Sequence, residues 1–164
     1  SSGEVMGIDD DFGLAYAKAQ MSAMGKIPLS GNVFISVKDK DKPFVVSIAK
    51  EFIELGFKII ATRGTANFLK ENHLEVEVVN KLQEGRPNVV DLIKNRQINF
   101  IINTVFGKKA QRDSMYIRRG ALHYKIPYTT TVSGASAIVK AIRRLKEVPV
   151  KIKSIQEYHR EVLG

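Results

Sequence analysis

Hydrophobic and polar positions along this chain follow two alternating patterns. Short runs of apolar and β-branched residues predict strands, and apolar residues recurring every three or four positions predict amphipathic helices between them. Strands are expected at 33–37, 57–61, 76–79, 98–102 and 128–131. Helices are expected at 42–55, 66–71, 88–96, 112–124 and 134–145. Strands alternating with helices indicate an α/β fold, in which a parallel sheet of about five strands carries helices on both faces.

Individual residues define several of these boundaries. Asp41 is expected to cap the first helix, whose buried stripe would be Phe44, Ile48, Phe52 and Leu55, and Ile138, Ala141, Ile142 and Leu145 should face inward from the last of the five. Two further helices are predicted near the ends of the chain. One follows the acidic run 9–11, where apolar residues recur at helical spacing, and the other begins at the capping box 154–157. Because 27–31 has the composition of a linker, we expect residues 1–30 to differ in origin from a domain at 31–164.

Composition restricts the class of protein. At 164 residues, 44% hydrophobic and 26% charged, the chain is expected to form one globular domain. No apolar run is long enough to span a membrane and no signal segment is evident. The absence of cysteine excludes disulfides and thiolate metal ligands and fits a cytoplasmic protein, and the three histidines argue against a His-rich metal site. Since residue 1 is not methionine, we expect either a processed chain or, preferably, a piece of a longer protein.

Positive charge is concentrated in the second half of the chain. Residues 1–80 carry a net charge of −2, residues 81–125 carry +7 and residues 126–164 carry +4, which together make the overall +9. Such asymmetry indicates an anionic partner: a nucleic acid, a small phosphate ligand or an acidic protein surface. A solvated basic face would produce the same pattern.

The segment Thr62-Arg63-Gly64-Thr65 follows the second strand and precedes a helix. A helix N-terminus leaves backbone N–H groups unpaired, and hydroxyl groups beside a glycine would complete a phosphate-binding loop. The alternative is structural: Thr65 caps the helix while Gly64 makes the turn.

Polar residues also follow the other strands. Lys38–Lys42 come after the first strand, Asn80 and Lys81 after the third, and Asn103 and Thr104 after the fourth. Because the carboxyl ends of parallel strands lie at one edge of the sheet, these residues should converge with the threonine loop on one pocket. Two lysines, hydroxyl groups and an amide favour a phosphorylated small ligand.

Several motifs, in order and at matching spacing, resemble the C-terminal regulatory domain of the carbamoyl-phosphate synthetase large subunit, which has the methylglyoxal synthase-like fold. They are Ser36-Val37-(x)4-Lys42, Ala61-Thr62-Arg63-Gly64-Thr65-Ala66, Val79-Asn80-Lys81-(x)2-Glu84-Gly85-Arg86-Pro87, Ile101-Ile102-Asn103-Thr104 and Ile117-Arg118-Arg119-(x)2-Leu122. Segments 2–7 and 15–20 resemble the end of the preceding synthetase half. The similarity extends over nearly the whole chain and implies a three-layer methylglyoxal synthase-like sandwich.

The resemblance implies an allosteric domain without chemistry or cofactor of its own, which binds UMP or IMP. The parent enzyme would be an ATP-dependent, Mg- or Mn-requiring ligase of pyrimidine and arginine biosynthesis, partnered by a small glutaminase subunit. Carried over by position, the phosphate site would comprise Lys42, Thr62, Gly64, Thr65 and Lys81. Ser36, Asn103, Thr104 and Val105 would face ribose and base, and Thr130 matches a position at the family's ornithine site.

Departures from related patterns define the alternatives. Val105 stands where bacterial members often carry threonine, so one hydroxyl contact would be missing, and the chain lacks the tryptophan of the form regulated by N-acetylglutamate. Methylglyoxal synthase is a phosphate-eliminating lyase of the same fold. It has a His-Asp pair where this chain has Ser36-Val37-Lys38, and a Gly-Asp pair where this chain has Arg86-Pro87, so the acid–base groups of that enzyme are not expected here. The basic region 81–125 contains no recognised nucleic-acid-binding module, so we disfavour nucleic-acid binding.

Overall fold

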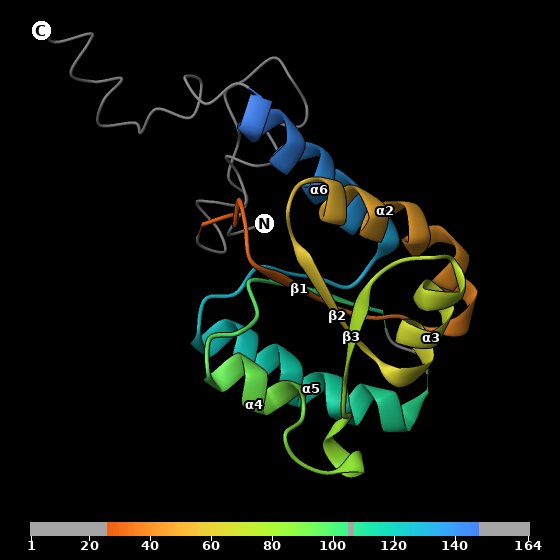
Figure 1. Cartoon of the computed structure of the whole chain (residues 1–164). Coiled ribbons are helices and arrows are strands. Elements are labelled where there is room, and N and C mark those ends of the chain that lie inside the picture. The colour runs from red at the N-terminus through yellow and green to blue at the C-terminus, as the bar shows by residue number, and fades with distance from the viewer. Residues whose placement is uncertain (1–25, 105–106, 148–164) are drawn as a thin grey trace, which may run out of the picture.

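The computed structural model describes residues 26–104 and 107–147, which form a sheet between two layers of helices (Figure 1). The elements in chain order are β1 (Asn32–Ser36), η1 (Asp39–Asp41), α2 (Lys42–Glu54), β2 (Lys58–Thr62), α3 (Arg63–Glu71), β3 (Val76–Val79), η2 (Leu82–Glu84), α4 (Val89–Lys94), β4 (Phe100–Asn103), α5 (Lys108–His123), β5 (Tyr128–Thr129) and α6 (Val132–Glu147). The helices expected near the two ends of the chain, and Val105, lie outside the described residues. None of the described helices is long and apolar enough to cross a bilayer.

The sheet has five strands in the order β3-β2-β1-β4-β5, and every neighbouring pair is parallel. The expected parallel α/β sheet is therefore confirmed. From β1 the chain moves outward through β2 to β3, then returns to the other side of β1 and continues through β4 to β5. The reversal lies between β1 and β4, where open α/β sheets characteristically bind ligands. The pairing places Ser36 directly beside Asn103 at the ends of these two strands.

A separate hydrophobic core covers each face of the sheet. Helices α2, α3 and α6 bury apolar side chains against one face, and α4 and α5 against the other (Figure 1). Consecutive residues of β1 serve opposite cores: Val33 and Ile35 point to the first and Phe34 to the second. Strands buried on both faces explain why their sequences are continuous apolar runs instead of alternating ones. The three-layer arrangement is confirmed.

Helix α2 differs from its predicted pattern at its beginning. Phe44 was expected in the buried stripe, but it is 64% exposed, and Val45 is buried in its place. The stripe then continues through Ile48 and Phe52, as expected. A helical turn is 3.6 residues, so starting the stripe one position later matches it better to the buried face. Asp41 precedes the helix without a side-chain capping bond, and the predicted cap is wrong in that respect.

Other boundaries shift by a few residues. Helix α3 begins at Arg63, three residues earlier than expected, so the expected loop is the first helical turn and Thr65 is not its cap. Helix α5 begins at Lys108 instead of 112, and β5 contains only two residues. In α6 the expected inward-facing residues are buried: Ile138, Ala141, Ile142 and Leu145.

Candidate binding site

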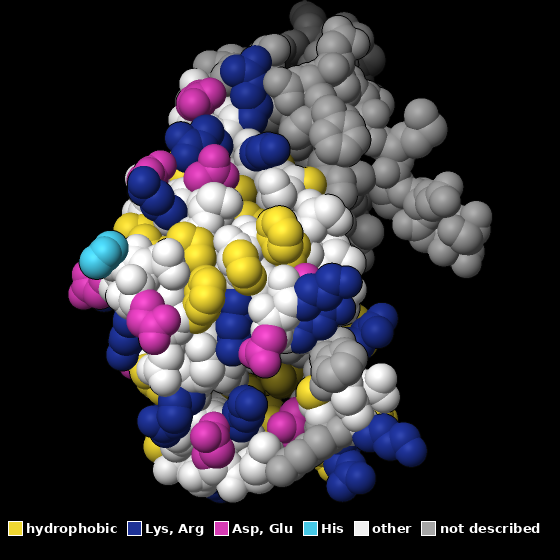
Figure 2. All heavy atoms as spheres, turned by 90° about the vertical axis from the view of Figure 1, so that its right-hand side faces the viewer, with side chains coloured by type: hydrophobic (Ala, Val, Ile, Leu, Met, Phe, Trp, Pro, Cys, Tyr) yellow, Lys and Arg dark blue, Asp and Glu magenta, His cyan; other side chains and the backbone are white. Residues whose placement is uncertain are grey.

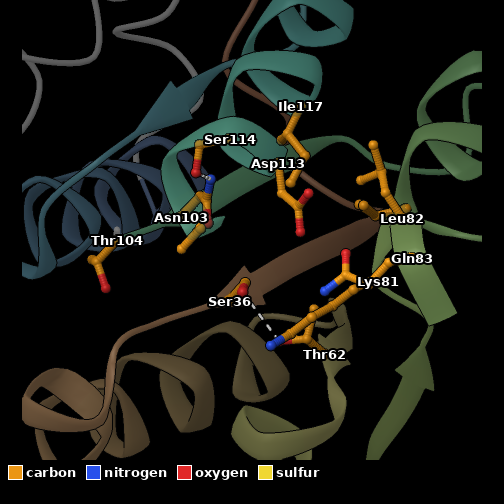
Figure 3. Close-up of a pocket in the computed structure, with 12 residues that line it drawn as sticks. Ser36, Thr62, Lys81, Leu82, Gln83, Asn103, Thr104, Asp113, Ser114 and Ile117 are labelled. Carbon is orange, nitrogen blue, oxygen red and sulfur yellow. Dashed lines mark hydrogen bonds between the residues drawn. The ribbon is translucent and has the colours of Figure 1, made fainter. Parts of the chain in front are cut away.

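A pocket lies at the carboxyl ends of the central strands, where the chain reverses direction (Figure 3). Its volume is about 270 Å³. This is just below the range of about 300–1,000 Å³ that is usual for ligand pockets, so the pocket has room for a small ligand only. It is lined from β1, β2, β4, η2, α5 and adjoining residues: Ser36, Thr62, Lys81, Leu82, Gln83, Val89, Asn103, Thr104, Ala110, Asp113, Ser114 and Ile117.

One side of the pocket is cationic and carries hydroxyl groups. Figure 3 shows the exposed Lys81 side chain extending from the end of β3 toward Ser36 and Thr62. The Thr62 hydroxyl donates a hydrogen bond of 3.1 Å to the Ser36 hydroxyl. Thr62 also occupies the capping position of α3, but its side chain makes no capping bond there. The first backbone N–H groups of α3 therefore donate no hydrogen bond to the Thr62 side chain and can donate to an anion.

Lys42 lies next to this end of the pocket without lining it. Its ammonium nitrogen is 3.3 Å from the place that a Cβ atom on Gly64 would occupy, so it lies over the first turn of α3. A glycine at this position gives the ammonium group close access to the backbone. The same nitrogen donates a 2.6 Å hydrogen bond to the carboxylate of Asp39. That bond and the charge of Lys42 lower the pKa of Asp39, and the charge of Lys81 lowers it further.

Two threonine hydroxyl groups near the pocket are engaged with the backbone after β1. Thr65 is buried, and its hydroxyl oxygen accepts a 3.2 Å hydrogen bond from the N–H of Val37. The hydroxyl oxygen of Thr104 accepts one of 2.9 Å from the N–H of Lys38, and the Thr104 N–H donates to the carbonyl of Ser36. These bonds tie the end of β1 to α3 on one side and to β4 on the other. They hold the strand end that carries Ser36 in a defined position.

The other side of the pocket is built around Asn103 (Figure 3). Its buried amide nitrogen donates to the hydroxyl groups of Ser114, at 2.9 Å, and Tyr128, at 3.0 Å. Burial raises the pKa of Tyr128, whereas the hydrogen bond from Asn103 and the charge of Arg118 lower it. Two partners fix the plane of the amide, so this group is oriented before any ligand arrives. The carboxylate of Asp113 points into the same pocket (Figure 3).

The structure therefore separates the predicted site residues into groups. Ser36, Thr62, Lys81, Asn103 and Thr104 line one pocket. Lys42, Gly64 and Thr65 lie beside its cationic end, through the contacts described above. Thr130 is exposed in the turn after β5 and does not line the pocket. Residues that follow β2, β3 and β4 therefore meet at one pocket, whereas Lys38, Lys40 and Asn80, which were also expected there, do not line it. The binding roles of all these residues stay predictions.

Sequence reasoning missed the contribution of α5. Ala110, Asp113, Ser114 and Ile117 line the pocket, and their spacing of three, four and seven positions places them on one face of the helix. This spacing was visible in the sequence, but a search limited to the ends of strands does not examine helix faces. Gln83, on η2, also lines the pocket; it lies in the polar segment 80–87 but was not among the predicted site residues.

Neither described histidine belongs to the pocket. His73 follows α3 and His123 ends α5, so both lie toward the edge of the sheet opposite the pocket. In the part of the chain that the structure describes, no group of three or more His, Cys, Asp or Glu residues could hold a metal ion.

Curated relatives at high identity are large chains of carbamoyl phosphate synthase. The chain is 54% identical over 158 residues to the protein of that name from Nostoc sp., covering 96% of this chain and 14% of the relative. It is 51% identical to the one from Archaeoglobus fulgidus, covering 98% and 15% respectively. It is also 48% identical to the "Carbamoyl phosphate synthase large chain, C-terminal section" of Aquifex aeolicus, covering 97% of this chain and 30% of the relative. The chain thus spans less than a third of each of these proteins.

The fold and the family are found independently. A crystal structure of methylglyoxal synthase from Elizabethkingia anophelis matches 69% of this chain and 79% of its own, with a TM-score of 0.55 and 20% identity, which shows a shared fold. A family profile described as "MGS-like domain" matches residues 44–130, more than half of the chain. This range contains most of the pocket, from Thr62 through Ile117. The chain belongs to the family of MGS-like domains.

Proposed function

We propose that this chain is the C-terminal allosteric domain of a carbamoyl-phosphate synthetase large chain and that its pocket binds a nucleoside monophosphate such as UMP or IMP. The parent enzyme would be cytoplasmic and would use ATP together with Mg or Mn. Its partners would be the preceding synthetase half and a small glutaminase subunit, and its product would serve pyrimidine and arginine biosynthesis. The high identity to proteins named as this large chain, over nearly all of the present chain, supports the parent assignment.

The observation that carries the proposal is the division of one small pocket into a cationic side and a polar side. Lys81 and the first turn of α3 lie near Ser36 and Thr62, and Lys42 lies just beyond them. Lysines and helix N-terminal N–H groups bind phosphate oxygens. A phosphate at this side would leave the rest of a mononucleotide in the pocket between η2 and α5.

The polar side offers complementary groups for ribose and base. The carboxylate of Asp113 can accept hydrogen bonds from two neighbouring ribose hydroxyl groups, and the Ser114 hydroxyl lies next to it. Asn103 presents an oriented amide. Leu82 and Ile117 supply apolar surface that can pack against a flat ring. Few oriented polar groups among apolar walls are typical of small-molecule sites.

Two other functions receive less support. A phosphate-eliminating lyase needs a base and an acid beside the substrate carbon, and Asp113 is the one carboxylate among the described residues that line the pocket, without a histidine beside it. Nucleic-acid binding would favour a continuous basic surface. Figure 2 instead shows Lys and Arg interspersed with Asp and Glu over the side of the molecule where α3 lies in Figure 1. On the face shown, charges of both signs lie close together, and the sequence carries no recognised nucleic-acid-binding module.

The proposal is tested on the parent large chain. We expect UMP or IMP to change its substrate affinity or turnover by about 5- to 150-fold, the usual range of allosteric coupling. Lys81→Ala should reduce this response, because it removes a cation from the phosphate side. Lys58→Ala is the matched control: Lys58 is an exposed lysine at the start of β2, on the opposite edge of the sheet, and the response should persist.

Two results would contradict the proposed function. One is a parent enzyme whose kinetics are indifferent to both nucleotides. The other is formation of methylglyoxal when the 164-residue chain is incubated with dihydroxyacetone phosphate, which would establish the lyase instead.

A further inference from the structure

The carboxylate of Asp39 occupies a place where positive charges converge. Asp39 begins η1, between β1 and α2, and its Oδ1 atom accepts the 2.6 Å hydrogen bond from Lys42 Nζ. The Lys42 side chain is 18% exposed and Asp39 is 95% exposed. The lysine is therefore held against the protein, while the carboxylate reaches it from the solvent side.

Two further positive sources act near the same place. Lys42 Nζ lies over the first turn of α3 at Gly64, where the helix dipole is positive. The hydrogen bond and the charge of Lys42 are the main causes of the lowered pKa of Asp39, and the charge of Lys81 adds a smaller contribution in the same direction. An ammonium group over a helix N-terminus lacks electrostatic compensation unless an anion is present. In this structure the carboxylate of Asp39 is the anion that contacts Lys42.

We propose that Asp39 is a resident counter-ion which competes with the ligand's phosphate for Lys42 and so sets the affinity of the site for phosphorylated ligands. This inference rests on the proposed function, since it concerns the same pocket. A phosphate near Lys42 and the first turn of α3 would meet the negative charge of Asp39. Because this side chain is exposed and its contact with Lys42 lies within a short local turn, it can rotate into solvent without disturbing either core.

A competing role and a purely structural role of Asp39 predict opposite changes in phosphate affinity when the residue is replaced. If Asp39 only positioned Lys42, its loss would weaken binding of a phosphate. If it competes, its loss strengthens binding, and only for ligands that carry phosphate. Because exposed ion pairs are weak, the expected change in affinity is at most about fivefold.

The test compares Asp39→Asn with Asp41→Asn in the 164-residue chain, using calorimetric titration with UMP, inorganic phosphate and uridine. Both variants remove one negative charge from the same turn. Asp41, however, lies near Lys38, at 4.0 Å, and not Lys42. We expect Asp39→Asn to bind UMP and phosphate about two- to fivefold more tightly. Asp41→Asn should show a clearly smaller change, and uridine should bind all three proteins equally.

A double-mutant cycle assigns the effect to Lys42. In a Lys42→Met background the gain from Asp39→Asn should largely disappear, because no contact is left to compete for. A gain that persists undiminished would contradict the proposal, as would unchanged or weaker UMP binding by Asp39→Asn. Binding of UMP by neither the unmodified chain nor Asp39→Asn would instead refute the proposed function, and the inference would fall with it. Circular dichroism of each variant verifies folding.

Discussion

Thr65 lies beside the pocket, and its side chain helps to hold together the elements that form the pocket. It is 2% exposed, and its hydroxyl oxygen is bonded to the Val37 N–H. Sequence position marked it as a phosphate ligand or a helix cap. Its hydroxyl group joins α3 to the end of β1. Any contribution to phosphate binding would come in addition to this bond.

Replacing Thr65 with valine should therefore reduce stability. The Val37 N–H is buried and would lose its partner, and an unsatisfied buried donor costs about 1–3 kcal/mol. Thr65→Ser keeps the hydroxyl group and should retain most of the stability. Urea unfolding followed by circular dichroism measures both variants. Equal unfolding midpoints for the valine and serine variants would show that the bond contributes nothing.

Some of the individual site residues could be predicted from the sequence, but their contacts could not. The rule that polar residues after parallel strands converge was sufficient to find Thr62, Lys81, Asn103 and Thr104, whereas Ser36 came from the family resemblance. It could not reveal which hydroxyl groups are already engaged. That depends on partners distant in sequence, such as Lys38 and Thr104, whose contact spans 66 positions.

At the scale of elements, the short turn η2 determines where Lys81 lies. The Glu84 N–H donates to the Lys81 carbonyl at 3.1 Å, and the Glu84 carboxylate accepts from the Lys81 N–H at 2.7 Å. The other carboxylate oxygen is 3.8 Å from Arg63 Nε, on the first turn of α3. Glu84 thus closes a small ring around the backbone of Lys81 and links it to α3.

We expect Glu84→Ala to weaken UMP binding by about 0.5–1.5 kcal/mol, because Lys81 loses the hydrogen bond that orients its backbone. Glu84→Gln keeps an oxygen that can accept from the Lys81 N–H and should bind UMP nearly as well as the unmodified chain. Glu77→Ala, an exposed glutamate on β3, is the control. Calorimetry distinguishes the variants. Tighter binding in both Glu84 variants would mean that its negative charge dominates and its bond to Lys81 is irrelevant.

Element boundaries were harder to predict than element types. The pattern around Thr62–Thr65 combines threonines with glycine, which favours a loop, yet α3 starts at Arg63 and its first turn buries Thr65 on the same face as Ala66 and Leu69. Burial of the helix face outweighed the local preference for a turn. Similarly, Asp113 and Ser114 become site residues only because α5 packs with that face at the pocket.

At the scale of the whole molecule, the order of the strands creates the site. Alternating elements predicted a parallel sheet, but no local pattern distinguishes the order β3-β2-β1-β4-β5 from others with the same elements. That order places β1 beside β4 and so brings Ser36 next to Asn103. Two hydrophobic cores cover the sheet, one on each face, and support the strands that carry the two sides of the pocket.

The central claim is that the pocket recognises the phosphate of a mononucleotide, and calorimetric titration of the 164-residue chain with UMP and uridine tests it most directly. We predict that UMP binds and that uridine binds far more weakly. Lys81→Ala should weaken UMP binding by about 1.5–3 kcal/mol, as expected for a hydrogen bond to a charged group, whereas Lys58→Ala should not. Equal affinity for UMP and uridine would contradict the account, because it would mean that the phosphate is not recognised.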